Sequence, residues 1–366
     1  MSSFSVLQEK LRQKHIPALD GIRVISVFAV ICYHFGFAQY PGVTTFFVLS
    51  GFLITWLLLS EQERTGTISV SEFYKRRSLR IFPAFYGYWI GTVVLLFVFG
   101  KHMAWKPTWA AFFFVSDYYG AINPQDVSAF GHTWSLAIEE QFYLLWPALL
   151  WIWRKDLVRM TWGTVCLIAC VWIHRALLAL VFDVSQSYIY RAFDTRFDNL
   201  LVGCLLAILL KRGVGRTFWD FLTRHAVLPL IIFGILMISV RYGGLLMKDY
   251  RDVVSYALHS VLIGVIMIQL IALSGSVMWR WLDWAPIRYL GRISYGMYLY
   301  QQLVLWPVKK MLLSFPVAVQ LAGGIAVTVA IASVSYYVLE RPFLKLRGKR
   351  KQMPAAVPVS EPASVN

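Results

Sequence analysis

Ten long runs of apolar residues dominate this sequence and restrict what the chain can fold into. A helix needs roughly 20 apolar residues to cross the hydrocarbon core of a bilayer. Because 58% of the 366 residues are hydrophobic, an ordinary soluble fold is excluded. The sequence therefore predicts an all-α polytopic membrane protein with about ten transmembrane helices. The expected spans are 19–38, 43–60, 82–100, 137–153, 161–182, 197–211, 226–241, 253–273, 287–306 and 317–339.

Lysine and arginine residues predict the orientation of these spans. With both termini in the cytoplasm, 24 of them fall on the cytoplasmic side and nine on the other, as the positive-inside rule requires. The net charge of +16 is therefore assigned to cytoplasmic loops, and no nucleic-acid partner is expected. We expect a cytoplasmic segment at 1–18, one membrane domain at 19–343 and a basic, then disordered, cytoplasmic tail at 344–366.

Two ionisable residues interrupt the first apolar run, LDGIRVISVFAVICYHFGF. Such residues are costly in a bilayer and usually face a protein interior or a water-filled cavity. Arg23 and His34 are eleven residues apart, so on a helix they share one face and lie roughly 16 Å apart along the axis. This spacing suits a ligand with an anionic head near Arg23 and a reactive end near His34. The alternative is that Arg23 reaches the interface and His34 only packs.

The second span contains the small pair Ser50-Gly51 within a bulky run, FFVLSGFLIT. Small residues allow two helix backbones to approach closely, which is the structural explanation. The functional explanation is that the pair leaves room beside a bound ligand.

A compact group of basic residues precedes the third span, in SEFYKRRSLRIFPAFY. Arg76 and Arg80 are four residues apart and Arg77 and Arg80 three, so all three cluster if this stretch is helical. Arginine side chains bind phosphate oxygens well. The predicted topology places this cluster and Arg23 on the cytoplasmic side, as a phosphorylated cytoplasmic donor would need.

Two glutamates lead into the fourth span, in GHTWSLAIEEQFYLLWP. One explanation is a capping box, in which Thr133 or Ser135 caps the helix and a glutamate lies in its first turn. The other is a functional carboxylate that orients His34 or binds a substrate hydroxyl. The sequence does not decide whether Glu139 or Glu140 has that role.

The cysteines and histidines show no metal-ligand spacing, so we expect no metal site. All four cysteines lie within apolar segments and are interpreted as packing residues. No permanently bound cofactor is expected either.

Six motifs together resemble the acyltransferase-3 family of integral membrane O-acyltransferases. They are LDGIR followed by His34, FFVLSGFLIT, RRSLRIFPAFY, TWSLAIEEQFYLLWP, RFDNLLVG and GRISYGMYLYQ, in this order between about Leu19 and Phe343. The resemblance implies a ten-helix membrane domain in the inner (plasma) membrane. It also implies transfer of an acyl group, commonly acetyl, from cytoplasmic acyl-coenzyme A to a hydroxyl of an envelope glycan or lipid-linked saccharide.

The resemblance also implies roles for individual residues. The family's essential arginine and histidine correspond to Arg23 and His34, its arginine motif to Arg76, Arg77 and Arg80, and its acidic motif to Glu139. Some relatives carry a fused extracytoplasmic hydrolase-like domain, which this sequence does not contain. We therefore expect transfer to finish in the membrane domain or on a separate protein. The alternative function is a transporter or flippase of a glycan intermediate that performs no acyl transfer.

Overall fold

The computed structural model describes residues 3–13, 15–37, 41–126, 128–246 and 250–346. Within these ranges the fold is all-helical and contains no strand, as the sequence predicts. The predicted tail from 347 onward lies outside the described residues.

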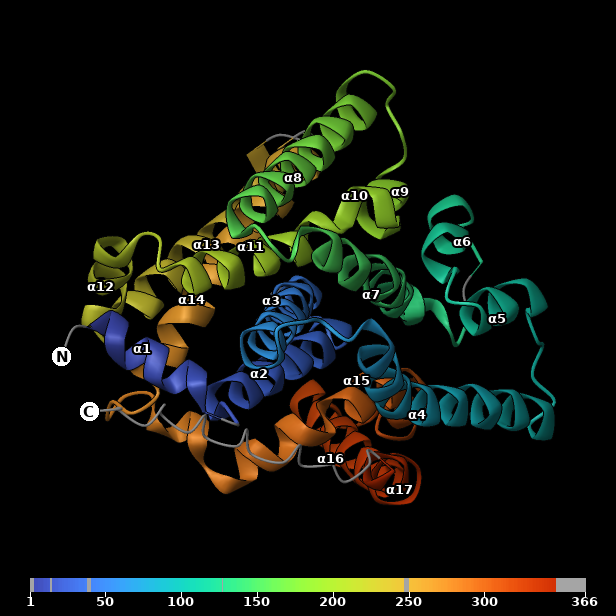
Figure 1. The fold of residues 1–366 in the computed structure, drawn as a ribbon. Helices are drawn as coiled ribbons and strands as arrows, with labels where there is room; N and C mark the ends of the chain where they lie inside the picture. Colours follow the sequence, from blue (N-terminus) through green and yellow to red (C-terminus); the bar gives the residue numbers. More distant parts are fainter. Residues whose placement is uncertain (1–2, 14, 38–40, 127, 247–249, 347–366) are drawn as a thin grey trace, which may run out of the picture.

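The α-helices surround a central pair, α2 and α3 (Figure 1). They are α1 (Ser3–Arg12), α2 (Pro17–His34), α3 (Gly42–Thr65), α4 (Val70–Val98), α5 (Trp105–Phe112), α6 (Ser116–Ile122), α7 (Trp134–Trp153), α8 (Leu157–Leu180), α9 (Gln186–Arg191), α10 (Phe193–Arg196), α11 (Asp198–Arg212), α12 (Arg216–Arg224), α13 (Leu228–Leu246), α14 (Tyr256–Leu273), α15 (Ala285–Met311), α16 (Val317–Ser335) and α17 (Arg341–Lys345). The short 3₁₀ and π segments are η1 (Gly131–Thr133), η2 (Tyr250–Ser255), η3 (Arg280–Asp283) and η4 (Tyr336–Glu340).

Six helical segments among the described residues are long and apolar enough to cross a membrane. They are Pro17–His34, Gly42–Thr65, Val70–Val98, Leu157–Leu180, Tyr250–Leu273 and Val317–Lys345. A seventh crossing is possible by length if Arg216–Arg224 and Leu228–Tyr242, which meet at 92°, form one bent span.

The other predicted spans also fall on helices, namely α7, α11 and α15, which are shorter or more polar than the six. Polar residues in such helices must face protein or a cavity, because lipid cannot solvate them. The protein is thus a multi-pass membrane protein, whereas the count of ten spans and the cytoplasmic location of both termini remain predictions.

Close backbone contact joins α3 to α11 in the centre of the fold. A Cβ atom added to Gly51 would lie 1.9 Å from the backbone oxygen of Leu200, and one added to Gly203 would lie 2.0 Å from that of Val48. No side chain fits at either position, so the two glycines set the distance between these helices.

Helices α2 and α15 run in the same direction. Near their N-terminal ends, a Cβ atom on Gly291 would lie 2.5 Å from the Cβ of Asp20. At their other ends, the Lys309 ammonium donates a hydrogen bond to the backbone oxygen of His34. The two contacts fix the register, so residues of α15 between Gly291 and Lys309 lie beside the length of α2.

Candidate functional site

A cavity of about 1180 Å³ lies between α2, α3, α4, α7 and α15. This exceeds the roughly 300–1,000 Å³ typical of pockets for small ligands. Six residues singled out from the sequence line the cavity, namely Arg23, Ser50, Arg76, Arg77, Arg80 and Glu139. Residues far apart in the chain therefore meet at one site.

The cationic part of the cavity is built on the first turns of α4. Ser69 caps this helix by accepting a hydrogen bond from the backbone N–H of Glu72 at 3.4 Å. The serine-to-glutamate spacing is that of a capping box, and it explains why the helix begins there. The arginines that follow are helical, so the predicted cluster forms. Of these, Arg76 is paired with Glu61 at 2.9 Å.

Glu139 lies at the centre of a polar group inside the cavity. Its carboxylate accepts hydrogen bonds from the Ser50 hydroxyl at 3.1 Å and the Tyr143 hydroxyl at 2.9 Å. The Arg77 guanidinium lies 3.8 Å from the same carboxylate and 3.8 Å from the centre of the Tyr143 ring. Arg77 is thus held by an ion pair and a cation–π contact together.

The capping explanation for the glutamates is wrong. Helix α7 begins at Trp134, and neither a Thr133 nor a Ser135 side chain caps it. Glu139 lies beyond the first turn, where the free N–H groups of a helix end are no longer within reach. Of the two glutamates, Glu139 lines the cavity and Glu140 does not.

The contacts of Glu139 also differ from the expected partnership with His34. Besides its hydrogen bonds, Glu139 interacts electrostatically with Arg77 and Arg23. It therefore lies at the Arg23 end of α2. His34 lies eleven residues further along the helix, or roughly 16 Å. The described contacts of Glu139 thus do not orient His34.

Arg23 is fixed by a second carboxylate. Its guanidinium lies 2.6 Å from Asp20, three residues earlier, and Asp20 also contacts the His15 ring at 2.7 Å. The Arg23 side chain is 20% exposed, which agrees with a position on the wall of the cavity. The sequence analysis missed Asp20, although its i, i+3 spacing from Arg23 could have identified the pair.

The two residues of the Ser50-Gly51 pair have different surroundings. The Ser50 hydroxyl faces the cavity and Glu139. Gly51 faces the opposite way and packs on α11, as described above, so the structure gives it a packing role rather than a place beside a ligand.

His34 is the last residue of α2, eleven residues after Arg23. It is not among the residues that line the cavity, and its backbone is held by Lys309. Two other residues add hydroxyl groups to the wall of the cavity. They are Ser135 and Tyr298, whose hydroxyls lie 2.5 Å apart. The sequence did not single out Tyr298, because a tyrosine in a motif of small residues gives no sign of which helix face it occupies.

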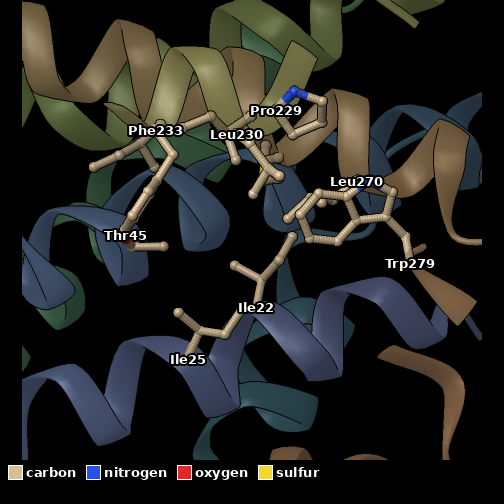
Figure 2. Close-up of a pocket in the computed structure, with 11 residues that line it drawn as sticks. Ile22, Ile25, Thr45, Pro229, Leu230, Phe233, Leu270 and Trp279 are labelled. Carbon is tan, nitrogen blue, oxygen red and sulfur yellow. The ribbon is translucent and has the colours of Figure 1, made fainter. Parts of the chain in front are cut away.

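A second, smaller cavity of about 210 Å³ lies between α2, α3, α13 and α14 (Figure 2). Aliphatic and aromatic side chains, including Ile22, Leu230 and Phe233, form most of its wall. Thr45 is the hydroxyl-bearing residue among the described lining, so this cavity offers little for catalysis. In the part of the chain that the structure describes, no group of three or more His, Cys, Asp or Glu side chains could hold a metal ion.

Comparison with known proteins agrees with the motifs. A family model described as an acyltransferase domain matches residues 16–337. The peptidoglycan O-acetyltransferase OatA of Listeria monocytogenes serovar 1/2a is 32% identical over 364 residues, covering 91% of this chain and 56% of the relative. The O-acetyltransferase OatA of Staphylococcus aureus is 30% identical over 373 residues, covering 93% of this chain and 59% of the relative. The chain thus spans a little over half the length of these relatives. No solved structure matches the chain significantly.

Proposed function

The chain belongs to this family of acyltransferase domains, and from that premise we propose that it is an O-acetyltransferase of the inner (plasma) membrane. It moves an acetyl group from cytoplasmic acetyl-coenzyme A to a hydroxyl of a cell-envelope glycan or lipid-linked saccharide. The name of the Listeria relative, which refers to peptidoglycan, supports a cell-wall glycan as acceptor.

The cationic cavity is the observation that carries the proposal. Five arginines, Arg64 among them, line one continuous space, which is large enough for an elongated donor. Guanidinium groups form paired, charge-assisted hydrogen bonds with phosphate oxygens. Arg76, Arg77, Arg80 and Arg23 bind the phosphates of coenzyme A, and the carboxylates that hold three of them in this structure keep the guanidinium groups in position.

The path through the cavity suits the rest of the donor. Besides the arginines, the hydroxyl-bearing residues Ser50, Ser135 and Tyr298 line the same cavity. The pantetheine arm, which carries amides, runs along these groups beside α2. The roughly 16 Å between Arg23 and His34 then separates the phosphates from the thioester.

His34 acts as the base in the transfer step. Its ring nitrogen takes the proton of the acceptor hydroxyl while the oxygen forms a bond to the acetyl carbonyl carbon. The carbon–sulfur bond breaks, and the coenzyme A thiolate that leaves receives the proton from His34. The thioester is already activated, so no metal is needed.

The proposal is tested with the purified full chain in detergent or nanodiscs. Acetyl-coenzyme A labelled in the acetyl group is added together with soluble peptidoglycan fragments. We expect labelled ester on the glycan and an equal amount of free coenzyme A thiol. His34→Ala at the same protein level is the control and should give neither product.

Absence of both products from the wild-type chain with every envelope glycan tested would overturn the proposal. Movement of unmodified glycan across sealed vesicles, without thioester cleavage, would favour the transporter alternative.

A further inference from the structure

A second histidine lies close to the transfer site, and its hydrogen bonding fixes which of its nitrogens carries the proton. His132 belongs to η1, directly before α7, and its side chain is buried. Its Nε2 atom lies 3.0 Å from the backbone oxygen of Leu299 on α15. A carbonyl oxygen only accepts hydrogen bonds, so Nε2 carries the proton and Nδ1 is a bare acceptor.

The Nδ1 atom of His132 is buried and has no hydrogen-bond partner among the described residues. The ring cannot turn away to find one. The Tyr88 and Tyr298 rings pack against it with centroids 5.5 and 5.7 Å away, and the Tyr298 hydroxyl donates to the His132 backbone oxygen at 3.1 Å. A buried hydrogen-bond acceptor normally has a donor. The unpartnered Nδ1 atom of His132 is therefore a place where a donor can bind during function.

His34, at the end of α2, carries a ring N–H group that can donate to this acceptor. Burial, and after it the charge of His34, lowers the pKa of His132 to about 3, so the two rings lie within electrostatic reach and His132 is neutral. Leu299, which anchors His132, lies between the contacts of α15 with the start and the end of α2. Glu139, in contrast, lies at the Arg23 end of α2.

We propose that His132 is a positioning residue whose Nδ1 atom accepts a hydrogen bond from the ring N–H of His34. This proposal rests on the function proposed above. The bond leaves the other nitrogen of His34 unprotonated and directed at the acceptor hydroxyl, the arrangement that a base and its orienting group adopt in acyl-transfer sites. When His34 takes the hydroxyl proton, His132 retains the bond to the imidazolium and keeps its own proton on Nε2.

Two substitutions separate this role from simple packing. In His132→Gln, the amide nitrogen can replace Nε2 and donate to Leu299, but no acceptor remains at the Nδ1 position. In His132→Asn, the side-chain oxygen occupies the Nδ1 position, but nothing reaches Leu299. We expect Gln to lower turnover about tenfold to a hundredfold, as loss of an orienting partner typically does. The Michaelis constant for acetyl-coenzyme A should stay unchanged. Asn should retain most of the turnover and unfold at a lower temperature.

The opposite order, with the Gln variant active and the Asn variant inactive, would overturn the proposal. The hydrogen bond to the backbone oxygen of Leu299 would then be the contact of His132 that matters for turnover. Wild-type turnover in both variants would overturn it as well. His225→Gln, an exposed histidine between α12 and α13, is the matched control and should behave as wild type. If the wild-type chain itself transfers no acetyl group, the proposed function fails. If wild type is active and both variants match it, only the role of His132 fails.

Discussion

Replacing Glu139 by glutamine isolates the charge of the carboxylate at the centre of the cavity. Glutamine keeps the shape of the side chain and can still exchange hydrogen bonds with Ser50 and Tyr143. What it loses is the attraction to Arg77, whose side chain is only 24% exposed. The substitution therefore tests how the arginine is held.

The expected size of the effect follows from the 3.8 Å separation of Arg77 and Glu139. Two unit charges at this distance attract by about 4 kcal/mol at an effective dielectric constant of about 20. Part of this is lost to solvent, which reaches both side chains, so about 1–3 kcal/mol should remain. Glu139→Gln should lower the thermal midpoint of unfolding by roughly 1–4 °C.

A double-mutant cycle measures the pair directly. Arg77→Met alone leaves Glu139 without its cation, and Glu139→Gln alone leaves Arg77 without its anion. The double variant leaves neither charge behind, so it should be more stable than the sum of the two single effects predicts. Thermal unfolding of the four proteins in the same detergent gives the coupling energy. Strictly additive effects would refute the idea that the two charges stabilise each other.

The same variant distinguishes two roles of Glu139 in catalysis. If Glu139 only holds Arg77 in position for the phosphates, Glu139→Gln should weaken acetyl-coenzyme A binding and leave turnover at saturating donor near normal. A fall in turnover by orders of magnitude at unchanged donor affinity would instead assign Glu139 to the transfer step, as the sequence predicts.

Four other substitutions make separate predictions. His34→Ala should abolish transfer at wild-type protein level, and full activity by the glycan acetylation assay would remove His34 from the mechanism. Arg80→Ala should weaken acetyl-coenzyme A binding about tenfold to a hundredfold without changing acceptor affinity, and unchanged donor binding would leave the arginine a role in topology alone. Gly203→Ala should strongly reduce the yield of folded protein, because its Cβ would lie 2.0 Å from a backbone oxygen, whereas Gly91→Ala, with open space around it, should not. Burial raises the pKa of Asp117, in α6, to about 6, above its unfolded value of about 3.9, so its contribution to stability is complete below about pH 4 and is lost as the pH rises through 6. Asp117→Asn should therefore unfold like wild type at pH 4 and be more stable by up to about 3 kcal/mol at pH 7, as measured by unfolding midpoints in detergent.

Hydropathy and local spacing were enough to predict the fold class. In lipid, every backbone N–H and C=O group must find its hydrogen-bond partner within the protein, as it does in a helix. The i, i+3 and i, i+4 spacing of Arg76, Arg77 and Arg80 was enough to predict their cluster. Likewise, the eleven-residue interval between Arg23 and His34 follows from helix geometry alone.

Contacts between distant segments could not be read from the sequence. A glutamate near the start of a helix has the same local pattern whether it caps that helix or faces a cavity. Only the packing of α3, α4 and α7 brought Ser50, Arg77 and Glu139 together. Similarly, Ser50 and Gly51 are adjacent on a helix and point in different directions. Because α11 packs against Gly51, Ser50 is the residue that lines the cavity.

The sequence by itself determined which residues carry charge and which helix faces they share, since a helix repeats every 3.6 residues whatever surrounds it. The tertiary structure alone decided which of these faces meet. It moved Glu139 to the Arg23 end of α2 and brought His132 into reach of His34, because the depth at which two helices cross depends on the packing of all their neighbours.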